Sequence, residues 1–231
     1  MKAYVLHAVN DLRYDDIPIP DCPKDWAIVE VKAAGICSSD IARVFTKGTY
    51  HFPTIPGHEF AGIVKSVGCE SDNRWIGKKV GIFPLIPCRT CSQCKEKHYE
   101  MCANYDYVGS RRDGGFAEYV AVPVWNLIEL PDNIRYEVAA MLEPLSVALH
   151  AIKIGDVKQG DSVAIIGTGM IGIAAGQWAK KFDAKNVTVI GRNEDKRNLI
   201  ENCGLEYKVS NFTDDMDEYD FVLEAVGTPS S

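Results

Sequence analysis

A short apolar run that leads directly into three closely spaced glycines restricts the fold of this chain more than any other feature. The run covers residues 162–166, and a segment with helical character (173–182) and a second apolar run (186–190) come after the glycines. Glycines at this spacing let backbone N–H groups approach a pyrophosphate at the start of a helix. Because the order is strand, glycine turn, helix and strand, the sequence predicts a dinucleotide-binding unit. The residues expected to bind the cofactor in this turn are Gly167, Gly169, Met170, Ile171 and Gly172.

The end of the second strand in such a unit contacts the ribose of the cofactor. Enzymes that use NAD usually have an acidic residue there, which bonds the 2′-hydroxyl, whereas this chain has Gly191 and Arg192. An arginine can pair with a 2′-phosphate, so the sequence favours NADP slightly over NAD. The alternative is that Arg192 is solvated or stacks on the adenine, and that the cofactor is NAD.

Four cysteines lie close together in the middle of the chain, with the spacing C-x2-C-x2-C-x7-C. Gaps of two residues let a loop turn back so that several thiolates surround one ion, and the segment has little apolar content to order it otherwise. The spacing therefore predicts a structural zinc site. An iron–sulfur cluster is the competing interpretation, and unrelated free thiols are the simplest one. The ligands would be Cys88, Cys91, Cys94 and Cys102.

A second group of potential metal ligands is spread along the first two thirds of the chain. Cys37, His58 and Glu143 offer one thiolate, one imidazole and one carboxylate. Three protein ligands with a fourth position open are typical of a catalytic zinc rather than a structural one. For His58 alone, the simpler interpretation is a buried histidine that hydrogen-bonds to the backbone.

Composition limits the partners and the compartment of the protein. The chain has 231 residues and a net charge of −7, which argues against nucleic acid or an anionic membrane surface as its main partner. No apolar run approaches the roughly 20 residues of a membrane span, and the N-terminus lacks the pattern of a signal peptide. Eight cysteines, four of them clustered, fit metal binding in a reducing compartment better than disulfides. We therefore expect a cytoplasmic protein.

Local patterns predict two structurally different parts. Helical periodicity covers 136–152, with a break or a start at Pro144. A short helix is expected at 38–46, and short alternating strands at 3–6, 12–15, 26–33, 60–67, 79–83 and 116–122. The prediction is a compact, partly closed antiparallel sheet, followed from residue 162 by buried parallel strands and helices.

As an ordered set, these motifs resemble those of the zinc-containing medium-chain alcohol/polyol dehydrogenases. The matching segments are Gly35-Ile36-Cys37-Ser38-Ser39-Asp40, Gly57-His58-Glu59, the four-cysteine loop, Gly114-Gly115-Phe116-Ala117-Glu118-Tyr119, Leu142-Glu143-Pro144 and the glycine turn at 167–172. Within that family, segment 105–119 is most similar to the galactitol-1-phosphate 5-dehydrogenases, followed by the sorbitol and threonine dehydrogenases.

The resemblance implies a fold of class α/β plus β. A GroES-like barrel catalytic domain with two zinc sites is expected at 1–152, and the first part of a Rossmann NAD(P)-binding domain at 153–231. Family members are considerably longer, so we expect a truncated Rossmann domain. The resemblance places the active site in the cleft between the two domains, and it implies a homodimer or a homotetramer.

The resemblance also implies a reaction. A substrate hydroxyl would lose its proton beside a zinc ion held by Cys37, His58 and Glu143, and its carbon would pass a hydride to NAD(P), which gives a ketone. The best candidate substrate is galactitol 1-phosphate, which would yield a ketose phosphate such as tagatose 6-phosphate. The alternatives are sorbitol or iditol, butanediol or threonine as substrate, or a catalytically inactive zinc-binding fragment.

Several further roles follow for single residues. Glu59 is the alternative carboxylate ligand of the catalytic zinc. Asp40 is expected to hold the ring of His58 in one orientation. Ser39 resembles the hydroxyl that begins the proton relay of the family, or else it caps a helix. Two neighbouring arginines are expected to bind a substrate phosphate, unless they form a solvated basic turn; these are Arg111 and Arg112.

Overall fold

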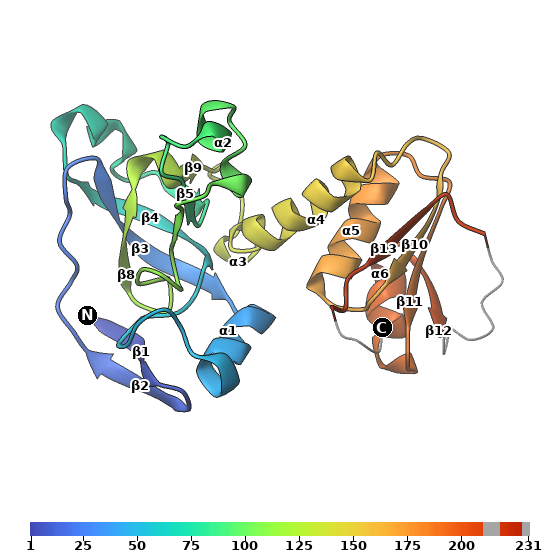
Figure 1. The fold of residues 1–231 in the computed structure, drawn as a ribbon, viewed down its shortest axis with the longest axis horizontal. Helices are drawn as coiled ribbons and strands as arrows, with labels where there is room; N and C mark the ends of the chain where they lie inside the picture. The colour runs from blue at the N-terminus through green and yellow to red at the C-terminus, as the bar shows by residue number, and fades with distance from the viewer. Residues whose placement is uncertain (210–217, 228–231) are drawn as a thin grey trace. The chain divides into compact units, whose positions relative to one another are not determined.

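The computed structural model describes residues 1–209 and 218–227. The chain divides into two compact units after Glu143, and the described residues of the second unit are 144–209 and 218–227 (Figure 1). Each unit has its own buried apolar core. Among the described residues, no helix is both long and apolar enough to cross a membrane. The predicted change from β-rich to α/β architecture along the chain is confirmed.

The first unit is built on a five-stranded antiparallel sheet in the order β8-β3-β4-β5-β9. Its strands are β3 (Trp26–Gly35), β4 (Glu59–Val67), β5 (Lys79–Ile82), β8 (Tyr119–Pro123) and β9 (Leu127–Glu129). Apolar side chains on one face of an antiparallel sheet can pack into a core while the other face meets solvent. The fully buried side chains of this core include Val29, Phe60, Val64, Val80 and Val122.

Two smaller hairpins and several short helices complete the first unit. β1 (Lys2–Ala8) pairs with β2 (Asp11–Asp16), and β6 (Leu85–Ile86) pairs with β7 (Asp106–Tyr107). The helices are α1 (Ser38–Ala42), the π-helix η1 (Arg43–Lys47), α2 (Ser92–Lys95), α3 (Tyr136–Ala139) and the 3₁₀ turns η2 (Glu70–Trp75), η3 (Tyr99–Met101) and η4 (Val124–Asn126).

The helix predicted over 38–46 changes from α to π geometry in its middle. Within it, the hydroxyl of Thr46 donates a hydrogen bond to the carbonyl of Ala42 at 3.0 Å. Such a side-chain bond competes with regular backbone bonding and bends a helix. The segment continues as η1, where the backbone N–H of Gly48 donates to the carbonyl of Arg43 at 3.1 Å, the five-residue spacing of a π-helix.

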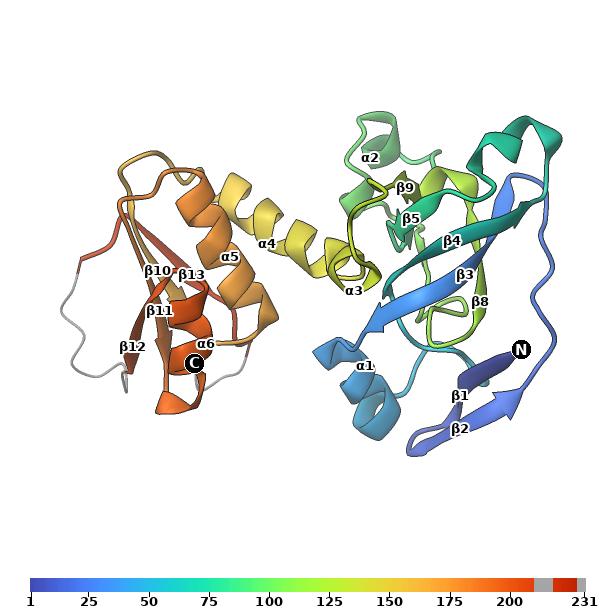
Figure 2. The ribbon, with the colours of Figure 1, turned by 180° about the vertical axis from the view of Figure 1, so that it is seen from behind.

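The second unit contains a four-stranded parallel sheet in the order β12-β11-β10-β13. Its elements are α4 (Leu142–Ile154), β10 (Ser162–Ile166), α5 (Met170–Lys181), β11 (Asn186–Gly191), η5 (Glu194–Lys196), α6 (Arg197–Asn202), β12 (Glu206–Val209) and β13 (Phe221–Glu224). If the strands of this sheet are numbered along the chain from β10 as strand 1, their spatial order is 3-2-1-4. This is the order of the first four strands in a doubly wound dinucleotide-binding sheet. α5 packs against β10 and β11, and α6 packs against β12 (Figure 2).

The division between the units falls earlier than the predicted boundary at 152/153. α4 begins at Leu142, and Pro144 lies in its first turn, where a proline removes no internal hydrogen bond. Ala148 and Ile152 of this helix are fully buried in the core of the second unit. Residues 144–152 therefore pack with the second unit, and the interruption of the helical segment lies just before α4 and not at the proline.

Candidate metal centres and cofactor turn

The ends of β3 and β4 bring three potential metal ligands together. Because the two strands pair antiparallel, Gly35 lies opposite Glu59. Cys37 caps the helix that follows β3, and His58 comes immediately before β4. One ligand atom each from Cys37, His58 and Glu59 lies within 4.8 Å of the other two. A Cβ at Gly35 would come 2.5 Å from Glu59 Oε2, so glycine leaves room for this carboxylate.

Asp40 lies behind the ring of His58 and is almost fully buried. Its Oδ1 is 3.3 Å from His58 Nδ1, and its Oδ2 accepts a hydrogen bond from the backbone N–H of Cys37 at 3.1 Å. The contact with His58 is an ion pair and not a well-directed hydrogen bond, because Nδ1 has no hydrogen-bond partner of good geometry. Burial lowers the pKa of His58, but Asp40 and Cys37 together raise it to about 10. With Nδ1 turned toward Asp40, Nε2 is the ring nitrogen left for a metal.

We expect Asp40→Asn to weaken zinc binding at this group by about 10- to 100-fold, because the amide keeps the shape of the side chain but loses the charge that orients the imidazole. Competition with a chelator of known zinc affinity measures the change. Asp16→Asn, which removes an exposed carboxylate paired with Lys2, is the matched control. Equal zinc affinity in the two variants would show that Asp40 does not support His58.

Two carboxylates compete for the role of third metal ligand. The sequence favoured Glu143, whereas Glu59 is the one that lies with Cys37 and His58. Glu143 is close enough for its charge to act on both His58 and Glu59. Burial raises the pKa of Glu59 and of Glu143, and repulsion between the two adds to the rise at Glu143. A cation would relieve this repulsion, so either carboxylate is available to a metal.

Tyr107 is a site residue that sequence reasoning missed. Its hydroxyl donates to Glu143 Oε1 at 3.4 Å, and its ring meets that of His58 edge-on, with the ring centroids 5.9 Å apart. Burial and the charge of Glu143 raise the pKa of the Tyr107 hydroxyl, so this group remains a hydrogen-bond donor. No spacing rule marks the residue, because only the pairing of β6 with β7 fixes its position.

The start of α1 fixes Ser39 beside the thiol of Cys37. The ring of His58, and to a smaller extent Ser39, lower the pKa of Cys37 against the opposing effect of burial. Arg43 donates to Ser39 Oγ at 2.7 Å and lies 3.4 Å from Asp40 Oδ1. It thereby holds the hydroxyl that was expected to begin a proton relay. Sequence reasoning missed Arg43 as well, because its role depends on the helical turn that places it over Ser39.

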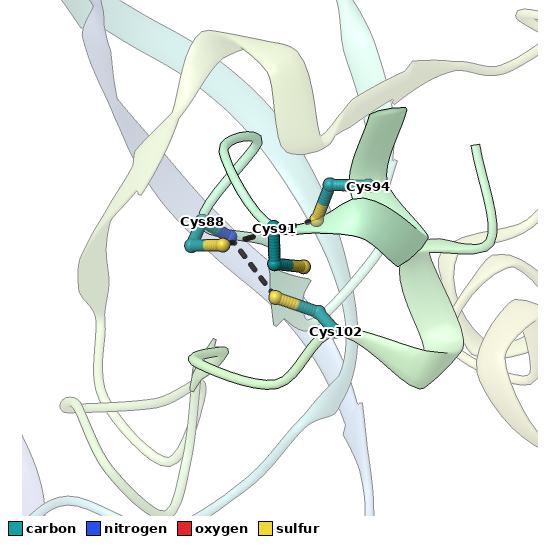
Figure 3. Close-up of side chains that lie close together, drawn as sticks. All are labelled: Cys88, Cys91, Cys94 and Cys102. Carbon is teal, nitrogen blue, oxygen red and sulfur yellow. Dashed lines mark hydrogen bonds between the residues drawn. The ribbon is translucent and has the colours of Figure 1, made fainter. Parts of the chain in front are cut away.

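Four sulfur atoms converge in the loop between β6 and β7 (Figure 3). All four ligand atoms lie within 4.8 Å of one another, and the Sγ atoms of Cys88 and Cys94 are 4.0 Å apart. A tetrahedral zinc ion with bonds of about 2.3 Å needs sulfur–sulfur distances of about 3.8 Å, which is close to the spacing found here. None of the eight cysteines forms a disulfide, so all four thiols of this loop are available to a metal. The group fits a single tetrahedral ion. A cluster of several irons would need its thiolates farther apart, because the cluster itself fills the space between them.

The electrostatics of this loop also favour a cation. The side chain and backbone of Thr90 lower the pKa of Cys88 to about 5, whereas burial and the neighbouring thiols raise the pKa of Cys94 to about 12. The backbone N–H of Cys88 donates to Cys102 Sγ at 3.2 Å. A divalent metal among the sulfurs would let all four thiols ionise, because its charge offsets their mutual repulsion.

The predicted cofactor turn lies between β10 and α5. Gly167 has a φ of +124°, which glycine adopts readily and other residues do not. A Cβ at Gly172 would come 2.1 Å from the carbonyl oxygen of Gly167, so the helix can approach the turn only without a side chain there. α5 begins at Met170 with Gly169 as its N-cap, and a Cβ at Gly169 would meet open space. Backbone N–H groups of the first helical turn are thus available to a pyrophosphate.

Gly191 and Arg192 occupy the expected position at the end of β11. A Cβ at Gly191 would come 2.3 Å from Tyr207 Oη. Packing inside the unit therefore requires a small residue there, whatever the cofactor. Arg192 follows the strand and is exposed.

The two arginines expected to bind a substrate phosphate have partners within the protein. The guanidinium of Arg111 lies 4.1 Å from the ring centroid of Tyr50 and 4.5 Å from that of Tyr105. Arg112 forms an ion pair with Asp106. Among the described residues, no contact joins either guanidinium to the candidate metal ligands.

Proteins of known function share much of this sequence. Residues 23–132 match the alcohol dehydrogenase GroES-like domain. Over 88% of its length the chain is 38% identical to galactitol 1-phosphate 5-dehydrogenase of Escherichia coli (strain K12). Over 82% of its length it is 34% identical to sorbitol dehydrogenase of Bacillus subtilis (strain 168). It covers 59% and 55% of these two proteins, so the chain spans little more than half the length of the curated relatives it matches.

Solved structures share the fold. The crystal structure of galactitol-1-phosphate dehydrogenase from Escherichia coli matches 90% of this chain, with a TM-score of 0.84, 36% identity and 61% of that chain covered. A structure described as a zinc-binding dehydrogenase from Sinorhizobium meliloti 1021, bound to NADP, matches 98%, with a TM-score of 0.91, 31% identity and 70% of that chain covered. The prediction of a GroES-like domain followed by a Rossmann-type unit is confirmed. The chain belongs to the zinc-dependent alcohol/polyol dehydrogenase family.

Proposed function

We propose that this chain carries the catalytic zinc site of an NAD(P)-dependent dehydrogenase that oxidises a secondary alcohol of a polyol or polyol phosphate. The observation that carries the proposal is the group of Cys37, His58 and Glu59. A thiolate, an imidazole and one carboxylate leave one position open on a tetrahedral zinc ion, as catalytic sites require. The four-cysteine loop would hold a structural zinc, so we expect two zinc ions per chain.

A zinc ion bound at this site would supply a Lewis acid that lowers the pKa of a substrate hydroxyl toward neutrality. Ser39, held by Arg43 at 2.7 Å, would take up the substrate hydroxyl proton and pass its own hydroxyl proton to solvent water in the open pocket that it lines. Tyr107 donates to Glu143 and keeps that carboxylate oriented. The glycine turn between β10 and α5 would bind the pyrophosphate of the cofactor. With the cofactor bound there, its nicotinamide would accept the hydride and the product would be a ketone.

Galactitol 1-phosphate is the best substrate candidate, with a ketose phosphate such as tagatose 6-phosphate as product. The relative from Escherichia coli supports this choice, at 38% identity. Sorbitol is the second candidate, because sorbitol dehydrogenase of Bacillus subtilis is 34% identical. A homodimer or homotetramer and a cytoplasmic location stay predictions.

A substrate panel tests the proposal on the complete polypeptide that carries this sequence, loaded with zinc. Galactitol 1-phosphate, galactitol, sorbitol, butanediol and threonine are each offered with NAD and with NADP, and the reduced cofactor is followed by its absorbance. We expect the highest kcat/KM for galactitol 1-phosphate. If no compound is oxidised although zinc fills both groups, the proposal is contradicted and a zinc-binding protein without catalysis is favoured.

Arg192→Ala should raise the KM for NADP by about tenfold and change the KM for NAD by less than about twofold, because of the two cofactors only NADP carries a 2′-phosphate that can pair with a guanidinium. Steady-state kinetics with the two cofactors measure the difference. Arg135→Ala, which removes an exposed arginine from the first unit, is the matched control. An equal effect of Arg192→Ala on both cofactors would contradict the slight preference for NADP.

A further inference from the structure

An open pocket lies beside Ser39 on the first unit. It has a volume of about 390 Å³ and is lined by residues of α1, η1 and the three positions that follow them. Its lining includes Ser39, two basic side chains, Arg43 and Lys47, and the aromatic ring of Tyr50. Because Ser39 contacts both Arg43 and the thiol of Cys37, the pocket adjoins the candidate catalytic metal group.

Two basic side chains line this pocket, and of the two only Arg43 has an acidic partner. Of the described residues that line it, none is acidic, and within the described part of the chain Lys47 forms no ion pair. Arg43 lies 3.4 Å from Asp40. That carboxylate is buried, and it also accepts a hydrogen bond from the backbone N–H of Cys37 and pairs with the ring of His58. In a chain with a net charge of −7, a pocket with two cations and no acid favours an anionic ligand.

Contacts outside the pocket hold its wall in place. Thr49 Oγ1 donates to the carbonyl of Ser110 at 2.6 Å. The guanidinium of Arg111 lies 4.1 Å from the ring centroid of Tyr50, although Arg111 is not part of the lining. Arg111 therefore packs against Tyr50 from outside the pocket and does not line it. The basic side chains that line the pocket are Lys47 and Arg43, of which Arg43 also bonds Ser39 and pairs with Asp40.

The pocket lies at a suitable distance from the metal group for one end of a phosphorylated hexitol. The guanidinium of Arg43 lies 2.7 Å from Ser39 Oγ, and Lys47 follows Arg43 by four residues at the end of η1. In galactitol 1-phosphate oxidised at carbon 5, six bonds of an extended chain separate the reacting carbon from the phosphorus, which is roughly 7 Å. The reacting hydroxyl can therefore lie beside Cys37 and Ser39 while the phosphate reaches Arg43 and Lys47.

We propose that Arg43 and Lys47 form the subsite that binds the phosphate group of a phosphorylated polyol. This inference rests on the proposed function and deepens it, because it names a phosphate monoester and not a neutral polyol as the substrate class. A guanidinium and an ammonium both make charge-assisted hydrogen bonds to phosphate oxygens. A phosphate of the dinucleotide offers the same chemistry, so the test separates these two sources.

Lys47→Gln tests the subsite, because Lys47 is exposed and makes no hydrogen bond to Ser39, unlike Arg43. In the complete zinc-loaded polypeptide we expect this variant to raise the KM for galactitol 1-phosphate about tenfold. The KM for unphosphorylated galactitol and the KM for the cofactor should change by less than about twofold. Lys24→Gln, which removes an equal charge from an exposed position outside the pocket, is the matched control, and Lys47→Arg should restore binding.

Each other outcome overturns the inference in a recognisable way. A higher KM for the cofactor alone would assign the pocket to the dinucleotide. An equal rise for galactitol and galactitol 1-phosphate would show that Lys47 acts without contacting the phosphate. If the wild type oxidises galactitol 1-phosphate and Lys47→Gln leaves its KM unchanged, the subsite is wrong while the proposed function stands.

A wild type that oxidises no polyol phosphate would contradict the proposed substrate, and the subsite is then judged by binding alone. Calorimetric titration with inorganic phosphate is the measurement. Binding to the wild type and to Lys24→Gln, but not to Lys47→Gln, would support a phosphate subsite. No binding, or equal binding to all three proteins, would overturn it.

Discussion

Replacing Cys37 with alanine is expected to lower kcat/KM for polyol oxidation by about a thousandfold or more. The change removes the thiolate from a group in which the ligand atoms of Cys37, His58 and Glu59 lie within 4.8 Å of one another. A metal held by the remaining imidazole and carboxylate would bind weakly and without the open tetrahedral geometry. The substrate hydroxyl would then lose the Lewis acid that favours its ionisation. Steady-state kinetics with galactitol 1-phosphate measure the loss.

Cys69→Ala is the matched control for this variant. Cys69 is partly exposed and belongs to neither group of metal ligands, so its removal should leave the kinetics unchanged. Far-UV circular dichroism and thermal unfolding should be similar for both variants, because Cys37 is not part of an apolar core cluster. A Cys37→Ala protein that retained the wild-type kcat/KM would contradict the catalytic role of this metal site.

Replacing Cys94 with serine is expected to lower the midpoint of thermal unfolding by about 10 °C. The loop between β6 and β7 contains only the short elements α2 and η3, and its buried side chains include two of its own cysteines, Cys94 and Cys102. A structural zinc would supply the ordering that apolar packing does not provide there. Serine preserves the size of the side chain but does not donate a thiolate.

Differential scanning calorimetry measures the midpoint, and limited trypsin digestion shows where order is lost. Lys95 and Lys97 are exposed in this loop, so cleavage there should become faster in Cys94→Ser and in wild-type protein treated with a zinc chelator. Cys69→Ser serves as the control for the loss of a thiol elsewhere. An unchanged midpoint together with unchanged cleavage would show that the loop holds its structure without a metal.

The grouping of the candidate metal ligands could be predicted from the sequence where it is local or follows from strand pairing. The four cysteines lie within 15 residues of one another, from Cys88 to Cys102, so the loop alone can gather them. Cys37 and His58 come together because β3 and β4 pair with Gly35 opposite Glu59. Antiparallel pairing of two successive long strands is a pattern that alternating apolar residues predict well.

Other parts of the site depend on packing that the sequence does not encode locally. Glu59 and Glu143 are equally plausible ligands by residue type, and only the fold shows that Glu59 lies in the group with Cys37 and His58. Tyr107 reaches Glu143 through a two-residue strand, which is too short to give a periodic signal. The boundary between the two units lies after Glu143 and not at the expected 152/153, because the helical pattern of α4 does not show which core buries this helix.

The number of zinc ions per chain tests the central claim most directly. Elemental analysis of the purified protein should give two zinc ions in the wild type and in Cys69→Ala. It should give one in Cys37→Ala, with the four-cysteine loop still filled, and one in Cys94→Ser, with the group of Cys37 and His58 still filled. A single zinc in the wild type that Cys94→Ser removes and Cys37→Ala does not would contradict a catalytic zinc site in this chain.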